Sequence, residues 1–147
     1  MSADTSHTLE IDSLVANEYA VEIDSERIHG VFRVAGLTPF KLDDDNTVVN
    51  VPFTLSKMVQ RDGNNTFNKW LRATVDAKGS GDRPTRTVAV IAIDDGVETR
   101  RWTFTGAYIT EVNYSAFDSA SSEMIEETVS IRYDGVTEAW SATKELE

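Results

Sequence analysis

The sequence contains no cysteine, which excludes disulfide bonds, thiol nucleophiles and metal sites built from cysteine ligands. It also lacks any apolar stretch near the ~18 residues that a membrane-spanning helix requires, so we expect no direct membrane insertion. The N-terminal segment has no basic region followed by an apolar run. We therefore expect no signal peptide, and the absence of cysteine is compatible with folding in the cytoplasm.

Basic residues are scarce compared with acidic ones. The 147 residues include 14 Lys and Arg against 25 Asp and Glu, which gives a formal net charge of −11. Binding to phosphate backbones requires clustered Lys and Arg, so we expect no nucleic-acid-binding surface and no recognition of a specific nucleic-acid sequence. The same argument disfavours binding to an anionic membrane surface. An acidic balance suits solubility, and it also suits a lining to which nucleic acid must not adhere.

Residues that could carry catalysis or bind a metal are few. His7 and His29 are the only histidines, and polar surface roles outweigh a metal site or a triad for them. The run Asp43–Asp45 cannot converge on one ion without a special loop. The segment that starts at Asp62 has calcium-loop spacing, but it lacks the glycine and the final acid of an EF-hand. No nucleophile elbow or phosphate-binding loop is present, so we expect no enzymatic activity, no metal and no cofactor.

Alternation of apolar and polar residues dominates the chain. In "RRWTFTGAYITEVNYSAF", residues 100–117, one parity contains Trp102, Phe104, Tyr108, Thr110, Val112 and Tyr114. This pattern predicts a strand of about fourteen residues, whereas ordinary strands have about five or six. A bend at Gly106 would let the strand pass from one layer of a sandwich to the other. Trp102 and Phe104 would anchor the core before the bend, and Val112 and Tyr114 would face inward beyond it. The opposite parity, with Glu111, Asn113 and Ser115, would face a wet surface.

Further period-two runs predict strands, at residues 19–24, 28–37, 48–59, 85–94 and 125–133. Residues 88–93 are apolar on both faces, which predicts a strand covered on both sides. Pro52 cannot donate to a ladder, so its strand lies at an edge or leaves the sheet there. The pair Asp95-Gly96 predicts a hairpin turn.

One helix is predicted at residues 66–77, where Phe67, Trp70 and Leu71 follow helical spacing. Asn65 or Thr66 can cap its start, and Gly79 can end it. Residues 38–50 are predicted to form a loop or a protruding hairpin. We therefore expect one mainly β domain over residues 1–147, an antiparallel sandwich or partly closed barrel of about six to eight strands with one flanking helix. An extended hairpin, an N-terminal arm (1–17) and a C-terminal tail (137–147) would project from it.

The order of these segments resembles the tail tube proteins of contractile phages and phage-tail-like injection systems, a T4-type fold related to the type VI secretion tube protein. No single motif carries the resemblance, which spans about residues 17–136. It rests on six matches in the right order: "YAVEID", "VFRVAGL", "FTLSKMVQRDG", "FNKWL", "RWTFTGAY" and "VNYSAFDSASSEMIEETVSIRYDG".

The resemblance implies a structural subunit of the inner tube of a contractile injection system or phage tail. Such subunits form stacked hexameric rings, joined sheet to sheet, around a channel for cargo or DNA. The implied partners are further copies of the chain, a contractile sheath protein, baseplate, spike and tube-terminator proteins, and a cargo effector in the channel. Assembly into an injection particle or virion tail would take place in the cytoplasm.

The resemblance also implies contacts between rings through the hairpin and the N-terminal arm. The oligomer-interface residues would then be Phe40, Lys41, Leu42, Asp43, Asp44, Asp45, Lys57, Met58 and Arg61. The channel-facing residues would be Glu111, Asn113, Ser115, Ser130 and Arg132. An acidic channel wall would keep cargo or DNA from adhering.

Two alternatives stay open at this point. The chain could be a tube-initiating subunit that joins the tube to the baseplate, since such subunits share the fold. A protein of a different class, a monomeric β-barrel that binds a ligand in its mouth, also fits the aromatic content.

Overall fold

The computed structural model describes residues 14–141. The elements in this part of the chain are β1 (Tyr19–Ile23), β2 (Glu26–Arg27), β3 (Val31–Ala35), β4 (Phe53–Met58), α2 (Thr66–Ala77), β5 (Arg86–Asp94), β6 (Val97–Tyr114), β7 (Glu126–Arg132) and β8 (Gly135–Trp140). All strand pairs are antiparallel. The predicted mainly β fold with one helix is therefore confirmed. No helix among residues 14–141 is long and apolar enough to cross a membrane.

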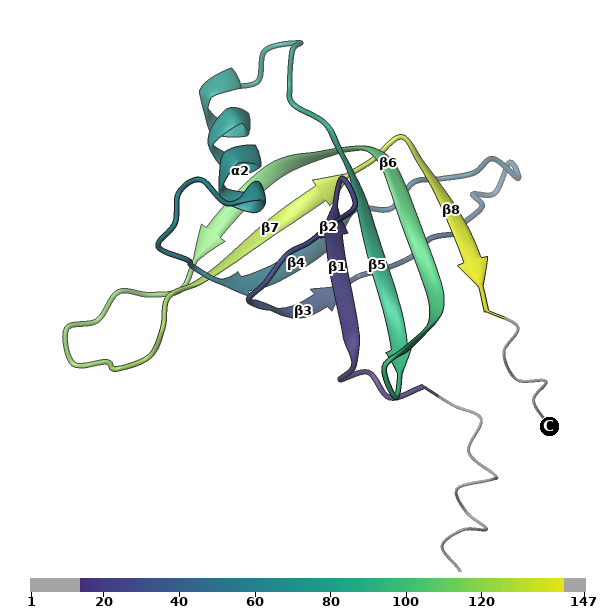
Figure 1. The fold of residues 1–147 in the computed structure, drawn as a ribbon. Coiled ribbons are helices and arrows are strands. Elements are labelled where there is room, and N and C mark those ends of the chain that lie inside the picture. The colour runs from purple at the N-terminus through teal and green to yellow at the C-terminus, as the bar shows by residue number, and fades with distance from the viewer. Residues whose placement is uncertain (1–13, 142–147) are drawn as a thin grey trace, which may run out of the picture.

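The strands form two layers that share β6 (Figure 1). The first layer consists of β2, β1, β5, the first half of β6 and β8, and the second layer consists of the second half of β6, β7, β4 and β3. The strand order β2-β1-β5-β6-β7-β4-β3 ends at two different strands. The sheet is therefore a partly closed sandwich that does not join into a barrel.

The long strand predicted from residues 100–117 is confirmed, but its inward face changes twice. Gly106 has φ +65, and after it Ala107 and Ile109 are buried, whereas Thr110 is exposed. A register shift between Ile109 and Glu111 then turns Val112 back toward the core. A left-handed glycine and a bulge each break the two-residue period. Phe104 is buried and Val112 packs against the core as expected, but the prediction that Tyr114 faces inward is wrong, because its side chain is 50% exposed.

Aromatic side chains from β4, from β6 and from the residue after β7 meet in the core between the layers. Phe53 and Phe104 lie with their ring centroids 4.7 Å apart, and Phe104 and Tyr133 lie 4.6 Å apart edge to face. Such pairs add specific geometry to the large apolar area that each ring buries. Beside them, α2 buries Phe67 and Trp70, and the indole of Trp70 donates to the Pro84 carbonyl at 3.1 Å.

Strand β5 is covered on both faces, as its sequence predicts. Val88 and Val90 belong to the central core, and Ala89 and Ile91 pack with Ala20 in a second cluster. The turn Asp95-Gly96 has φ values of +52 and +80, which fits the predicted hairpin between β5 and β6.

The C-terminal tail expected from residue 137 is shorter than predicted, because the structure places residues 137–140 in β8. This strand pairs with β6 from Arg100↔Trp140 to Thr105↔Gly135. This strand is mostly exposed, so the alternation of a half-buried strand is weak in its sequence. Residues 1–13 of the expected arm, with His7, and residues 142–147 of the tail lie outside the described residues.

Candidate assembly surface

The outer side of the second layer is a polar face. Its side chains alternate with buried core residues such as Leu55, Val129 and Ile131. Register aligns Glu111 with Ser130 and Asn113 with Thr128, and the hydroxyls of Ser56 and Thr128 are 2.8 Å apart. We call this set the polar face: Thr54, Ser56, Glu111, Asn113, Thr128, Ser130 and Arg132.

The predicted channel-facing residues all lie on this side of the layer. Glu111, Asn113, Ser130 and Arg132 belong to the polar face, and Ser115 continues it by exchanging hydrogen bonds with Glu126. Sequence reasoning missed the hydroxyls contributed by β4 and by Thr128, although the alternation in "FTLSK" and "EETVSIR" carries that signal.

The charge on the polar face is almost balanced. Glu111 is its carboxylate, Arg132 is its guanidinium, and Glu126 lies at its margin. The formal charge of −11 is thus not concentrated here. The other side chains of the polar face end in hydroxyl or amide groups, and the acidic channel wall stays a prediction.

The second layer has two edges without a strand partner among residues 14–141. Strand β3 pairs with β4 alone. Strand β6 loses its partner on the β5 side after Ala107, because β5 begins at Arg86 opposite that residue. From Tyr108 to Tyr114, β6 pairs only with β7. Unpaired edges expose backbone donors and acceptors that can bind another chain.

A groove runs beside the unpaired edge of β6. It has a volume of about 440 Å³ and lies between the C-terminal half of α2 and residues 108–112. Leu71, Val75 and Val112 give it apolar walls. The guanidinium of Arg83 stacks over the ring of Tyr108 at 3.6 Å from its centroid, so a cation and an aromatic ring close one part of the groove.

Residues 38–50 form the protruding hairpin. Leu42 and Val48 pair across it, and the Asp43 carboxylate accepts the amides of Asp45 and Thr47, each at 2.9 Å. Figure 1 shows this segment projecting from the sandwich, away from the loop between β6 and β7. Its exposed apolar side chains are Phe40, Leu42 and Val48.

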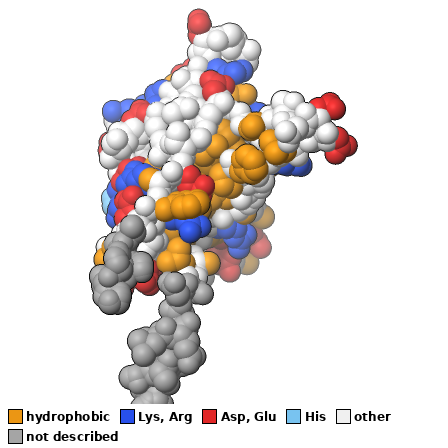
Figure 2. Space-filling view, turned by 90° about the vertical axis from the view of Figure 1, so that its right-hand side faces the viewer, with side chains coloured by type: hydrophobic (Ala, Val, Ile, Leu, Met, Phe, Trp, Pro, Cys, Tyr) orange, Lys and Arg blue, Asp and Glu red, His pale blue; other side chains and the backbone are white. Residues whose placement is uncertain are grey.

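Figure 2 shows hydrophobic side chains gathered beside a protruding loop that carries acidic side chains. The side chains of the hairpin part of the expected oligomer interface are accessible, because all of them are exposed: Phe40, Lys41, Leu42 and the run Asp43–Asp45.

No group of three acidic or histidine side chains within residues 14–141 is arranged to hold a metal ion.

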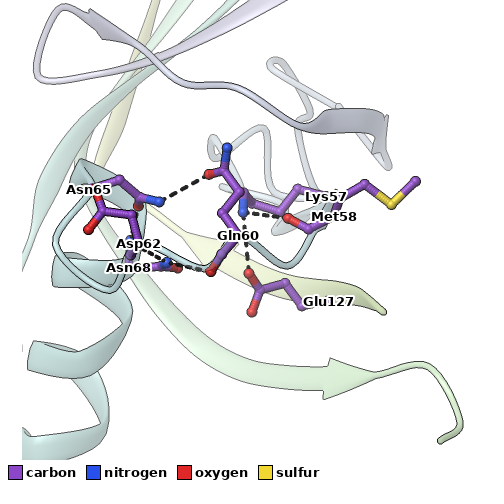
Figure 3. A network of polar contacts seen from close by, with 7 residues as sticks. All are labelled: Lys57, Met58, Gln60, Asp62, Asn65, Asn68 and Glu127. Carbon is purple, nitrogen blue, oxygen red and sulfur yellow. Dashed lines mark hydrogen bonds and ion pairs between the residues drawn. The ribbon is translucent and has the colours of Figure 1, made fainter. Parts of the chain in front are cut away.

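Lys57 does not belong to an exposed interface. Its side chain is fully buried, its ammonium lies 3.4 Å from Glu127 Oε1, and it donates to the Met58 carbonyl at 2.8 Å (Figure 3). The ring of Phe67 lies 4.8 Å from the same ammonium. The expected surface role of Lys57 is corrected, because the ion pair and the aromatic ring hold it inside the subunit. Met58 is half-buried and Arg61 is exposed.

A network of amides next to this ion pair sets the start of α2 (Figure 3). Asn65 is the N-cap, and its side chain accepts the amide of Asn68 at 2.8 Å. The side chain of Asn68 donates to the Asp62 carbonyl at 2.8 Å, and Asn65 donates to the Gln60 side chain at 3.1 Å. These bonds attach the 59–65 loop to the helix, which in turn forms one wall of the groove.

Comparison with solved structures shows a shared fold. A chain of the PVC sheath–tube complex, an extracellular contractile injection system in its extended state, is 16% identical with a TM-score of 0.70, over 95% of this chain and 100% of that one. The tube-terminating cap of the anti-feeding prophage is 16% identical with a TM-score of 0.70, over 88% and 92%. Hcp1 from Flavobacterium johnsoniae is 14% identical with a TM-score of 0.53, over 84% and 95%.

No curated protein sequence matches the chain. The family profile described as "T4-like virus tail tube protein gp19" matches residues 45–137. This region contains β4, α2, β5, β6 and β7, together with the whole polar face and the groove. Because the matched residues make up well over half of the sequence, the chain belongs to the T4-like virus tail tube protein family.

Proposed function

We propose that the protein is a structural, non-catalytic subunit of the inner tube of a contractile injection system or phage tail. Six copies form a ring, the rings stack, and the polar face lines a central channel for cargo or DNA. The observation that carries this proposal is a polar face bounded by two unpaired edges, β3 and the second half of β6.

The two edges favour a ring because they differ from each other. Strand β3 of one copy can pair with residues 108–114 of the next copy, which extends the second layer from subunit to subunit. A contact between two different edges is head-to-tail, and it closes into a ring when the rotation per subunit allows. The core side of each second layer then faces outward, and the polar face encloses the channel.

The hairpin supplies a second, stacking contact. Phe40, Leu42 and Val48 are exposed on an ordered projection, and apolar side chains in such a place are typical of interaction sites. We infer that the hairpin contacts the adjoining ring. Sheath, terminator and baseplate proteins are further partners, in line with the sheath–tube, terminator and baseplate assemblies that contain similar folds.

A second role in the same particle is supported by one comparison. A chain of the anti-feeding prophage baseplate is 11% identical with a TM-score of 0.63. The protein could thus form the layer that starts the tube at the baseplate. Copy number in purified particles separates the roles, because a bulk tube subunit is abundant and an initiator occurs in one or a few rings.

Site-specific labelling tests the ring and the position of the polar face. The chain has no cysteine, so Ser130→Cys carries a single thiol for a gold cluster, with Lys69→Cys on the exposed side of α2 as the matched control. We expect negative-stain images of rings or tubes with gold on the axis for Ser130→Cys and outside for Lys69→Cys. A monomer at high concentration, even with baseplate proteins present, would overturn the ring, and peripheral gold on Ser130→Cys would overturn the channel assignment.

A further inference from the structure

An aromatic cleft opens between the two layers where β1 and β3 lie near each other without pairing. Its volume is about 410 Å³, and its lining includes Tyr19, Phe32, Arg33 and Trp102. Tyr19 and Trp102 come from the first layer and Phe32 and Arg33 from β3. The cleft is thus an unfilled side of the sandwich core and is separate from the groove beside α2.

The hydroxyl of Tyr19 is a polar atom in this cleft that is available to bind an occupant. It is shielded from solvent, yet it has no hydrogen-bond partner among residues 14–141. Buried polar groups almost always have a partner. Burial raises the pKa of Tyr19, and the nearby Arg33 guanidinium partly opposes this. An occupant with a carbonyl or carboxylate oxygen would accept the hydrogen bond.

Arg33 defines the charge of the occupant. Its guanidinium lies 6.0 Å from the Phe32 ring centroid, and it takes part in none of the ion pairs among the described residues. The cleft therefore combines apolar aromatic walls with one unpaired cation at its margin. An extended segment that alternates apolar and acidic residues matches both features.

The chain contains such a segment directly before the cleft. In "TLEIDS", residues 8–13, Leu9 and Ile11 alternate with Glu10 and Asp12. Ala16 already lines the cleft, and the chain turns at residues 16–17. The five residues from Ile11 to Ala16 can span roughly 17 Å at ~3.3–3.6 Å per residue. So short a tether keeps the segment at a high local concentration.

We propose that residues 8–13 bind in this cleft of their own chain, with Leu9 and Ile11 against Phe32 and Trp102 and an acidic side chain on Arg33. A main-chain carbonyl of the segment accepts the hydrogen bond from Tyr19. The segment completes the open side of the core in the single subunit. This docking does not depend on ring formation, so it can be tested whether or not tubes assemble.

Disulfide trapping tests the position of the segment. Leu9→Cys combined with Phe32→Cys places two thiols in a chain that has no others. We expect an intramolecular disulfide under mild oxidation of dilute protein, seen as a faster non-reducing band and a mass lower by two hydrogens. The matched control, Leu9→Cys with Val75→Cys on α2, should remain reduced. A disulfide between two chains, or no more disulfide than in the control, would overturn the proposal.

Tryptophan fluorescence provides a second readout. Trp70 is fully buried and Trp140 is 67% exposed, so a Trp140→Phe background makes Trp102 the main reporter of the cleft. In that background, Leu9→Asp with Ile11→Asp should shift the emission to the red and increase quenching by acrylamide. The control Ser2→Asp with Ser6→Asp adds the same charge outside residues 8–13 and should change neither. Emission and quenching that stay the same in the Leu9 and Ile11 variant would contradict docking.

Discussion

Lys57 and Glu127 form an ion pair inside the subunit, directly opposite each other on β4 and β7, with Nζ and Oε1 3.4 Å apart. Both side chains are almost completely removed from solvent. Burying two charges costs free energy that their attraction only partly offsets, and removal of one partner leaves the other charge uncompensated. We infer that the pair acts on specificity, by favouring the register in which Lys57 on β4 lies opposite Glu127 on β7.

The first prediction concerns this pair. Lys57→Met should lower the free energy of unfolding by about 3–5 kcal/mol, because Glu127 would stay buried without its cation. The double variant Lys57→Met with Glu127→Leu should recover much of that loss. Urea unfolding followed by circular dichroism measures both. A double variant no more stable than the single one would show that the ion pair itself supplies the stability.

The second prediction concerns the bend in β6. Gly106 has φ +65, and the carboxylate of Asp134 occupies the space that a Cβ at this position would take. Gly106→Val should lower the free energy of unfolding by roughly 1–3 kcal/mol through backbone strain, and it should also reduce ring formation. Gly81→Val is the control, since no atom lies within 4 Å of its Cβ position. Equal thermal stability of the two variants would show that the fold does not depend on the left-handed conformation of Gly106.

The third prediction concerns alkaline pH. Burial raises the pKa of Tyr133 above its ordinary value of 10.0, although a hydrogen bond with the Val51 backbone opposes this. The phenol ionises first in the unfolded chain, so its contribution to stability is complete below pH 10 and is lost as pH rises beyond it. Urea unfolding between pH 8 and 11 should show this decrease. Tyr133→Phe should make the decrease shallower, and a Tyr133→Phe profile as steep as that of the unchanged protein would contradict the prediction.

The fourth prediction concerns the hairpin. Phe40→Ser, Leu42→Ser and Val48→Ser together should abolish stacking but leave the thermal unfolding of the subunit nearly unchanged, because these side chains are exposed in the single subunit. Electron microscopy should then show separate rings in place of tubes. The matched control, Val97→Ser at the exposed start of β6, should still form tubes. Tubes of normal length from the triple variant would rule out the hairpin as the stacking contact.

Local sequence patterns predicted the elements that depend on neighbouring residues, such as a helix cap, helical spacing or strand alternation. The helix occupies residues 66–77 as predicted, with Asn65 as its cap, since capping and helical spacing involve neighbouring residues. The inward positions Val129, Ile131 and Tyr133 follow from plain alternation and are buried. The coverage of β5 on both faces follows from its continuous apolar run.

Other features depend on segments that are far apart in sequence. The side chain of Asp134 lies against Gly106 at the bend of β6, a contact that no local pattern contains. Residues 135–140 carry a weak strand pattern, and they form β8 because they pair with the edge of β6. The sequence places Lys57 at an exposed interface, and only the approach of Glu127 and Phe67 makes its burial possible.

The amino-acid sequence alone determined the fold class, the strand-rich pattern, the helix, the long β6 and the resemblance to tail tube proteins, because these depend on local periodicity and on the order of segments. Only the tertiary structure decided that the polar positions of β4, β6 and β7 share one face, which edges lack a partner, and where the groove and the aromatic cleft lie. Those properties arise from the pairing and packing of distant strands, and the side chains that meet there carry no signal of one another along the chain.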